Sequence, residues 1–387
     1  MEKNKKILFD GRFLSLSHAG IGRYSMELLR YLLPLDTAQK YVVIVLKGTQ
    51  ITGDLAQKMN ERENPVEVVE VDAGHYSLAE QIKLPGIINS LKVDLVHFPH
   101  FNHPLLYKGD FVVTIHDLTL SLYAERGGKL KQSLYKKVIT HAARKSKKIF
   151  TVSDFVKKEL VREFDLLPQK VVTTYNGIDE NFKKITNPRI LAKAEQYGLK
   201  NPYILSVGQW RTHKNLLRLV DAYAQIIKDK KFAGHLDLVF VGRVDAKYPQ
   251  LQDKVKRLGL EGSVKFTGFV PDEDLPIIYN NATLFVFPSL SEGFGLPGLE
   301  AQACAVPLAS SDKTCLPEIF GEGAIYFNPM NTNDMTAKIK NVLEDEKLRS
   351  ALVSAGVQNS KRFSWEQTAR KTLEVYREIL YKDQSLD

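Results

Sequence analysis

Short apolar runs alternate with helical or loop segments along most of the chain. The first series of runs predicts strands at 7–9, 42–46, 66–71, 93–98, 111–116, 149–152 and 171–174. A second series predicts strands at 203–207, 236–241, 264–266, 284–287, 307–309 and 324–327. Between the first two runs, Tyr24, Leu28 and Leu32 share one face of a helix that we expect to end at Pro34. Strands that alternate with helices predict parallel sheets covered on both faces.

A break separates the two series. The segment Asn176–Asp179 reads Asn-Gly-Ile-Asp, which is typical of a turn, and residues 181–200 are charged, weakly periodic and interrupted by Pro188. We therefore predict an α/β protein with two doubly wound domains, at 1–182 and 183–363. A last amphipathic helix is predicted at about 364–381, and we expect it to pack back on the first domain.

Several glycine-bearing or charged turns follow the predicted strands. In open α/β sheets, ligands bind outside the carboxyl ends of the strands, so these turns indicate an enzyme with a ligand cleft. The turns are Gly20–Gly22, His116-Asp117, Gly208–Lys214, Gly242-Arg243 and Gly293–Gly295.

The segment Gly20–Gly22 is predicted to be a glycine loop before a helix that starts near Tyr24. The loop is only a weak indication of a phosphate-binding site, because Ser25 stands where a dinucleotide-binding fingerprint would have its third glycine. The alternative is a helix entry that needs only a flexible backbone. The sequence leaves both interpretations open, but it argues against a nicotinamide-dependent oxidoreductase.

The stretch Pro288–Cys304 carries two carboxylates, Glu292 and Glu300, on either side of a glycine loop. It follows an apolar run and has Pro297 where we predict the first position of a helix. Such a helix start offers free N–H groups and a positive dipole end to an anion. A loop that holds a phosphate, with a carboxylate for hydroxyls on each side, suits a nucleotide-sugar. A tight turn with a helix-capping glutamate is the structural alternative.

Two cations and one histidine follow other strands. Arg211 and Lys214 suit a diphosphate, Arg as a planar fork and Lys as a point charge. His116, at the end of its strand, is suited to a sugar hydroxyl or a phosphate. A solvated charged loop and a structural histidine are the respective alternatives.

A metal site is not expected. The spacing of His100, His103 and His116 matches no established zinc pattern. The segment Asp272–Asp274 resembles the Asp-x-Asp of metal-dependent sugar transfer, but its position before an apolar helix favours helix capping.

The composition indicates which kind of protein and which compartment to expect. The 387 residues are 44% hydrophobic and 26% charged, as in ordinary soluble enzymes. No apolar run approaches the ~20 residues that span a bilayer, and the first apolar run is too short for a signal peptide. With only two cysteines, we expect a cytoplasmic protein without disulfide bonds.

The net charge of +9 is concentrated in one segment. Lys129–Lys148 contains eight Lys or Arg residues and no Asp or Glu. Leu130, Leu134, Val138 and Ala142 form an apolar stripe along it, so it predicts a basic amphipathic helix for an anionic membrane surface. A core-facing helix with a solvated basic face is the alternative. No nucleic-acid-binding module is present, so nucleic acid is not an expected partner.

Taken in order, these motifs resemble the retaining glycosyltransferases of family 4. The resemblance extends over nearly the whole chain, and its specificity lies in the order and combination of the motifs. The motifs are GIGRY at 20–24, TIHDL at 114–118, TVSDF at 151–155, NGID at 176–179, VGxxxxxKN at 207–215, GFVPDEDLP at 268–276 and SEGFGLPGLEAQAC at 291–304.

The resemblance implies the GT-B fold, two Rossmann-like domains with the active site between them, and it implies residue roles. Glu292 faces the donor sugar as a catalytic residue, with His116 and Lys214, and Glu300 binds the ribose. The implied donor-binding residues are Gly22, Arg211, Lys214, Val270, Glu292, Phe294, Gly295, Leu296 and Glu300.

Four positions depart from the family pattern. Gln209 and His213 stand where arginines are common, so Arg211 is the candidate for the second cation on the diphosphate. Gly298 replaces a common proline and Ala305 a common glycine, which we expect to affect only the local backbone.

The function implied is retaining transfer of a hexose to a glycan or polyprenyl-linked acceptor in cell-surface polysaccharide synthesis, without a metal or other cofactor. Similarity to bacterial polysaccharide mannosyltransferases makes GDP-mannose the first candidate donor and UDP-hexoses the second. The expected location is cytoplasmic, at the inner face of the membrane if residues 129–148 bind lipid. A non-catalytic sugar-nucleotide-binding relative is the alternative outside enzymes.

Overall fold

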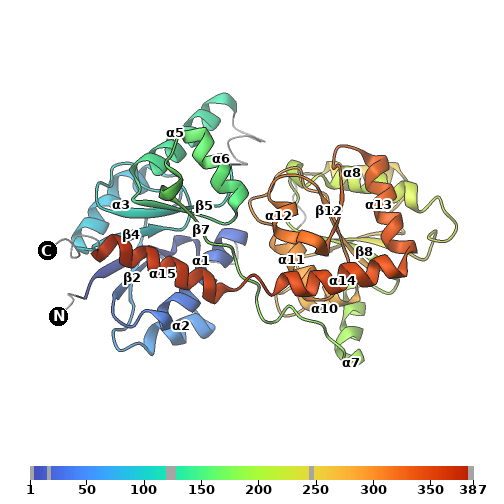
Figure 1. Cartoon of the computed structure of the whole chain (residues 1–387), viewed down its shortest axis with the longest axis horizontal. Helices are drawn as coiled ribbons and strands as arrows, with labels where there is room; N and C mark the ends of the chain where they lie inside the picture. The colour runs from blue at the N-terminus through green and yellow to red at the C-terminus, as the bar shows by residue number, and fades with distance from the viewer. Residues whose placement is uncertain (1–3, 15–18, 119–127, 244–247, 382–387) are drawn as a thin grey trace. The chain divides into compact units, whose positions relative to one another are not determined.

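The computed structural model describes residues 4–14, 19–118, 128–243 and 248–381. The chain divides into two compact units (Figure 1). The first unit contains residues 1–177 and 364–387, and the second contains residues 178–363. The division therefore comes after Gly177 in the turn, where the sequence suggested residue 182.

Within the described residues, the first unit is a parallel seven-stranded sheet with the order β3-β2-β1-β4-β5-β6-β7. Each strand lies within two residues of a predicted apolar run. The strands are β1 (Lys6–Asp10), β2 (Lys40–Leu46), β3 (Glu67–Val71), β4 (Leu95–Phe98), β5 (Phe111–Ile115), β6 (Lys148–Thr151) and β7 (Val171–Thr173). The helices are α1 (Ala19–Leu35), α2 (Gly53–Asn60), α3 (Leu78–Ser90), α5 (Gly128–Lys145), α6 (Asp154–Phe164) and α15 (Trp365–Tyr381), with short 3-10 turns η1 (Gly11–Phe13) and η3 (Pro168–Lys170).

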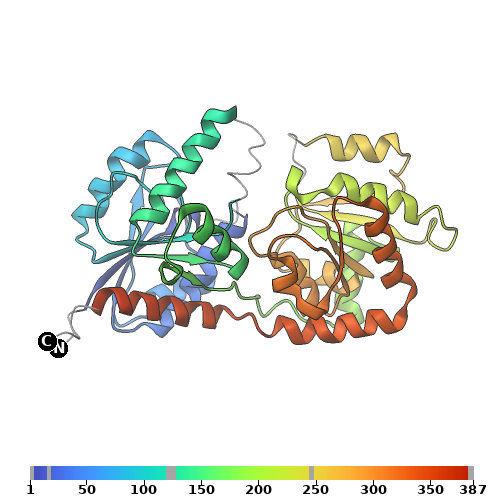
Figure 2. The ribbon, with the colours of Figure 1, turned by 45° about the horizontal axis from the view of Figure 1, so that its top comes forward.

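Helices cover both faces of this sheet (Figures 1 and 2). One face buries apolar side chains of α1, α2 and α15, and the other buries those of α3, α5 and α6. The last helix thus belongs to the first unit. There the Tyr376 hydroxyl bonds His97 Nδ1 at 2.5 Å, and the Thr368 hydroxyl donates to the carbonyl of Tyr175.

The second unit is a parallel six-stranded sheet with the order β10-β9-β8-β11-β12-β13 among the residues described. Its strands are β8 (Tyr203–Val207), β9 (Asp237–Val241), β10 (Val264–Gly268), β11 (Leu284–Phe287), β12 (Leu308–Ser311) and β13 (Ile325–Phe327). Its helices are α7 (Pro188–Leu191), α8 (Leu216–Ile226), α9 (Gln250–Arg257), α10 (Leu275–Asn281), α11 (Leu296–Ala303), α12 (Leu316–Phe320), α13 (Thr332–Glu344) and α14 (Glu346–Ser360), with 3-10 turns η4 (Ala192–Tyr197), η5 (Thr212–Lys214) and η6 (Gly321–Gly323).

Both sheets are doubly wound, and the strand order of each reverses at one point. In the first unit this switch lies between β1 and β4, and in the second between β8 and β11. Loops that leave a sheet at such a switch diverge to opposite faces, which opens a crevice at the carboxyl ends of the strands. The segments after these four strands are therefore where the fold favours a ligand.

The prediction of a glycine loop at Gly20–Gly22 is wrong. Both glycines lie inside α1, which already includes Ala19 and continues past Pro34 to Leu35. Two glycines cost a helix about 1 kcal/mol each relative to alanine. The buried face of α1, which carries Tyr24 and Leu28, offsets this cost by packing on the sheet.

None of the helices in the described ranges is both long enough and apolar enough to cross a membrane.

Candidate functional site

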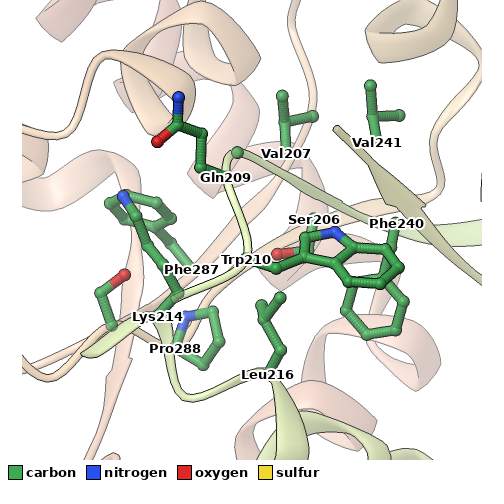
Figure 3. Close-up of a pocket in the computed structure, with 12 residues that line it drawn as sticks. Ser206, Val207, Gln209, Trp210, Lys214, Leu216, Phe240, Val241, Phe287 and Pro288 are labelled. Carbon is green, nitrogen blue, oxygen red and sulfur yellow. The ribbon is translucent and has the colours of Figure 1, made fainter. Parts of the chain in front are cut away.

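Lys214 and Glu292 meet at the switch point of the second sheet. Lys214 ends η5 after β8, Glu292 follows β11, and the two strands are neighbours. Lys214 Nζ lies 2.6 Å from Glu292 Oε1, with 18% and 13% of the two side chains exposed. The ammonium also lies 5.4 Å from the centre of the Phe287 ring. Figure 3 shows the end of the Lys214 side chain over this ring. The topology therefore brings together two of the residues that the sequence singled out, beside a small pocket under the Gly208 loop.

The loop that carries Glu292 is held from two sides. Leu290 N donates to the carbonyl of His213 at 2.7 Å, which ties it to the Lys214 turn. From the other side, the hydroxyl of Thr314 accepts from Glu292 N, and the thiol of Cys315 lies 3.3 Å from the carbonyl oxygens of Glu292 and Phe294. Burial raises the pKa of the Cys315 thiol, so the sulfur keeps the proton that it donates. Thr314 and Cys315 have no motif around them, and sequence reasoning missed them.

Helix α11 begins where the loop ends. Gly295 has φ +105°, a conformation that glycine adopts without strain, and its missing side chain leaves room for Phe287, Leu316 and Phe320. Leu296 is the first helical residue, so Pro297 occupies the second position and not the predicted first. Phe294 is buried against Phe363.

Glu300 is buried in α11, and its Oε2 accepts from the hydroxyl of Tyr279 at 2.8 Å. This contact fixes the direction of the carboxylate. The side chain is therefore preorganised, but one of its acceptor positions is already used.

The remaining residues expected at the donor differ in their exposure. Arg211 is exposed and forms no ion pair within the ranges that the structure describes, so its guanidinium is available to an anion. Val270 is buried. The preceding Phe269 is 54% exposed and carries the guanidinium of Arg243 over its ring at 5.1 Å.

His116 and Gly22 lie in the first unit. His116 follows β5, and Gly22 is buried in α1 two residues before Tyr24. The rings of Tyr24 and His116 meet edge to face at 4.8 Å, and the Tyr24 hydroxyl bonds Thr114 Oγ1 at 3.0 Å. The turn and the helix are thus linked through one aromatic side chain.

The contact of His116 with the Pro99 carbonyl defines its tautomer. Nε2 lies 2.8 Å from this oxygen, and a carbonyl only accepts, so Nε2 carries the hydrogen. Burial lowers the pKa of the imidazole, although the hydrogen bond to Pro99 and the charge of Asp117 oppose this. The ring is therefore neutral near pH 7, with an unprotonated Nδ1 that can accept a hydrogen bond from a hydroxyl.

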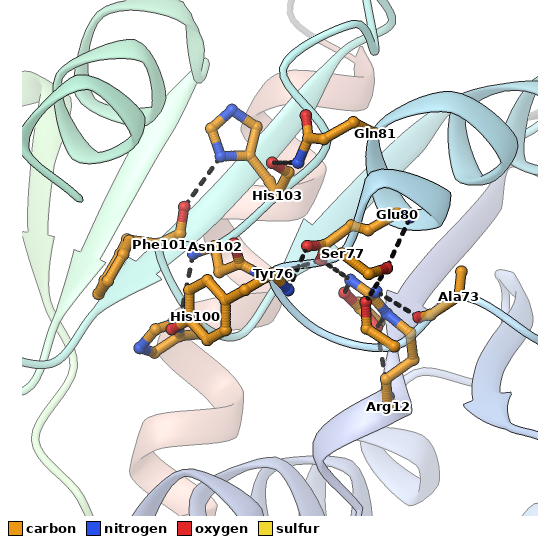
Figure 4. Close-up of polar contacts among 12 residues, drawn as sticks. Arg12, Ala73, Tyr76, Ser77, Glu80, Gln81, His100, Phe101, Asn102 and His103 are labelled. Atoms are coloured by element: carbon orange, nitrogen blue, oxygen red, sulfur yellow. Dashed lines mark hydrogen bonds and ion pairs between the residues drawn. The ribbon is translucent and has the colours of Figure 1, made fainter. Parts of the chain in front are cut away.

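A buried polar network supports the loop that carries Pro99 (Figure 4). The Arg12 guanidinium bonds Asp10 at 2.7 Å and Glu80 at 2.8 Å, and all three side chains are fully buried. Glu80 also accepts from the amide of Asn102 at 2.7 Å. The network therefore joins the end of β1, the start of α3 and the loop after β4. Sequence reasoning missed it, because the segments that it joins lie far apart along the chain.

Buried neutral histidines make the first unit sensitive to acid. Burial lowers the pKa of His97 to about 3 and that of His103 to about 4. The unfolded chain binds protons at both sites below about pH 6.5 while the folded state does not, so stability falls as the pH drops from 6.5 towards 4. Between pH 6.5 and 5.5 we expect a loss of roughly 1 kcal/mol per histidine, measured by urea unfolding.

The matched variants for this prediction are His103→Asn and His235→Asn. The first removes a buried site and should flatten the pH dependence, whereas His235 is exposed in the second unit and its replacement should not. Equal slopes for both variants and the wild type would contradict the assignment.

No three His, Cys, Asp or Glu side chains come close enough to hold a metal ion in the described part of the chain. His103 instead donates from Nδ1 to the Phe101 carbonyl and accepts at Nε2 from His141, at 2.9 and 2.8 Å. Asp274 stands at the N-cap position of α10, but its side chain makes no capping hydrogen bond and its carboxylate accepts from the Tyr197 hydroxyl at 2.6 Å. The capping role predicted for this acidic segment is therefore wrong for Asp274.

Two family models match the two units. The model for glycosyl transferases group 1 matches residues 190–359, and that for glycosyltransferase family 4 matches residues 19–182. Together they cover well over half of the chain.

Individual relatives agree with this result. The O-antigen chain mannosyltransferase B of Escherichia coli is 28% identical over 385 residues, which make up 96% of this chain and 99% of that protein. The serotype-specific mannosyltransferase WbdA of Escherichia coli is 32% identical over 246 residues, 62% of this chain but 30% of that longer protein. The crystal structure of Anabaena HepE with UDP-glucose has the same fold, with a TM-score of 0.73 at 20% identity over 96% of this chain and 99% of that one. The chain therefore belongs to the family 4 glycosyltransferases, has the GT-B fold and is a glycosyltransferase.

Proposed function

We propose that the protein transfers mannose from GDP-mannose, with retention of configuration, to a glycan or polyprenyl-linked acceptor in cell-surface polysaccharide synthesis. The observation that carries the proposal is the pairing of Lys214 with Glu292 at the switch point of the second sheet. The family of the chain and the names of the two mannosyltransferases described above support mannose as the transferred sugar.

The residues of the second unit have distinct roles in this proposal. Lys214 and Arg211 neutralise the charge that develops on the leaving diphosphate, together with the backbone amides at the start of α11. Glu292 accepts hydrogen bonds from the donor sugar, and Glu300 from the ribose. Phe294, Gly295 and Leu296 enclose the sugar and phosphates, and Val270 lies beside the base.

The first unit contributes His116 and Gly22. The unprotonated Nδ1 of His116 accepts a hydroxyl hydrogen of the sugar, and Gly22 permits close approach of the α1 backbone. The acceptor hydroxyl attacks from the face that the diphosphate leaves, and a phosphate oxygen takes its proton. Because side chains and amides supply the positive charge, the proposal requires neither a metal ion nor another cofactor.

The experiment is a donor screen with the purified full-length chain. GDP-mannose should raise the melting temperature more than UDP-glucose, UDP-galactose or ADP-glucose, and should be consumed with an acceptor extract. The anomeric signal of the product in proton NMR should show the configuration of the donor. Stabilisation by a UDP-sugar alone would reject GDP-mannose, and an inverted product would reject retention.

A UDP-hexose donor is the second candidate, favoured by the UDP-glucose in the HepE crystal structure, which has the same fold. A non-catalytic relative that binds sugar nucleotides is the third. Binding without donor hydrolysis or transfer would identify it. We propose a cytoplasmic location, where nucleotide-sugars are made.

A further inference from the structure

One face of the first unit combines exposed apolar side chains with cations. Three of the four most exposed large hydrophobic side chains among the described residues are Leu78, Ile82 and Leu106, at 80%, 69% and 62%. Tyr76, which is 50% exposed, precedes them. Burial of such side chains in an apolar medium is favourable, so a cluster of them indicates a contact surface.

Two of these apolar residues lie on α3, and the third lies in a loop that is hydrogen-bonded to α3. Leu78 and Ile82 are four positions apart on α3, so they share one side of the helix. The side chain of Gln81 in α3 accepts a hydrogen bond from Leu105 N at 2.8 Å. This bond holds the loop after β4 against α3. Leu106 is therefore fixed beside α3.

The basic helix α5 continues this surface. The rings of Tyr76 and Tyr135 meet edge to face at 5.6 Å, and His103, in the loop after β4, bonds His141 of α5 at 2.8 Å. Figures 1 and 2 show α3 and α5 side by side on one face of the sheet. The exposed side of α5 carries Lys136, Lys137, Arg144 and Lys145, with Ser133, Thr140 and His141. Lys136 pairs with Glu163 of α6 at 2.9 Å.

Acidic residues are missing from the exposed sides of both helices. Residues 128–148 contain no Asp or Glu, and the single acid of α3, Glu80, is buried on Arg12. The sequence predicted an apolar stripe within residues 129–148, but Val138 and Ala142 are buried in the core, and the side chains of Leu130 and Leu134 lie outside those described. The apolar part of the surface comes from α3 and its neighbouring loop instead.

We propose that Leu78, Ile82 and Leu106 insert into the interface of an anionic lipid membrane while the cations of α5 bind lipid phosphates. Charge complementarity selects this partner, because the cations of α5 adjoin the apolar residues and neither α3 nor α5 exposes an acid among its described side chains. Glu163 of α6 pairs with Lys136, which leaves Lys137, Arg144 and Lys145 to bind lipid phosphates. The proposal extends the proposed function by placing the enzyme on a surface where a lipid-linked acceptor would lie. It does not depend on the identity of the donor.

The test is vesicle flotation of the full-length chain without donor or acceptor, so the result is independent of activity. Binding should occur with vesicles of phosphatidylcholine and phosphatidylglycerol, weaken with salt, and be much lower with phosphatidylcholine alone. Leu78→Ser/Ile82→Ser and Lys137→Glu/Lys145→Glu should each weaken it about tenfold or more.

Matched controls separate this surface from general effects. Leu167→Ser removes another exposed leucine of the first unit, and Lys256→Glu/Lys347→Glu makes the same change of net charge in the second unit. Both controls should bind like the wild type, and every variant should keep its melting temperature because the replaced side chains are exposed. Absence of binding to anionic vesicles at low salt would overturn the proposal and favour a protein partner. Equal losses in test and control variants would also overturn it.

Discussion

Replacing Glu292 with alanine is expected to lower kcat/KM by on the order of 100-fold or more, the usual effect of losing one preorganised transition-state contact. Lys214→Ala should cause a loss of similar size, because it removes a cation that we propose neutralises the leaving diphosphate. Initial rates of donor consumption at several donor concentrations measure both effects. A change in KM alone would mean that the contact forms equally in the ground state.

The 2.6 Å contact between Lys214 and Glu292 adds a second expectation. Each single variant leaves the other charge partly buried without its partner, so the losses should not be additive. The double variant is expected to lose less than the product of the two single losses. Glu261→Ala, which removes an exposed carboxylate from the same unit, is the matched control. Turnover like the wild type in folded Glu292→Ala would contradict the catalytic assignment.

The strands could be located from the sequence because both faces of each sheet are covered. A parallel strand buried on both faces is a short apolar run, and β8 and β11 have the predicted bounds. Helix ends were harder to predict, since local chemistry competes with packing. Gly20, Gly22 and Pro34 all signal an interruption, yet the packing of α1 overrides them.

Part of the candidate site follows from topology. Once two series of parallel strands are predicted, the residues after neighbouring strands must lie near one another, as Lys214 and Glu292 do. The contacts that hold the loop could not be predicted, because a hydroxyl and a thiol at Thr314 and Cys315 are common anywhere in a chain. Ala305, at a position where the family resemblance implies glycine, has φ +59°, a backbone conformation that favours glycine.

Replacing Arg12 with methionine is expected to destabilise the first unit by about 3–5 kcal/mol. The guanidinium is fully buried and is the cation that bonds both Asp10 and Glu80. Burial disfavours its charged form, yet the two carboxylates raise its pKa, and burial would raise the pKa of Asp10 if Arg12 did not hold it low. Without Arg12, two carboxylates would be buried without a counterion.

Thermal unfolding followed by calorimetry measures this effect. For a unit of this size we expect the transition assigned to the first unit to fall by about 10 °C, while that of the second unit stays in place. Arg370→Met is the matched control. Its side chain is 58% exposed and pairs with Glu366, which is 51% exposed, so its loss should cost less than about 1 kcal/mol.

A triple variant separates the two physical causes of the loss. Asp10→Asn and Glu80→Gln, added to Arg12→Met, remove the uncompensated charges without restoring the ion pairs. Recovery of most of the stability would show that the network is costly to break because it leaves charges buried. No recovery would show that hydrogen bonds such as Asn102 to Glu80 carry the loss. In that case Pro99, and with it the tautomer of His116, should also shift, and the imidazole nitrogen signals in NMR would report the shift.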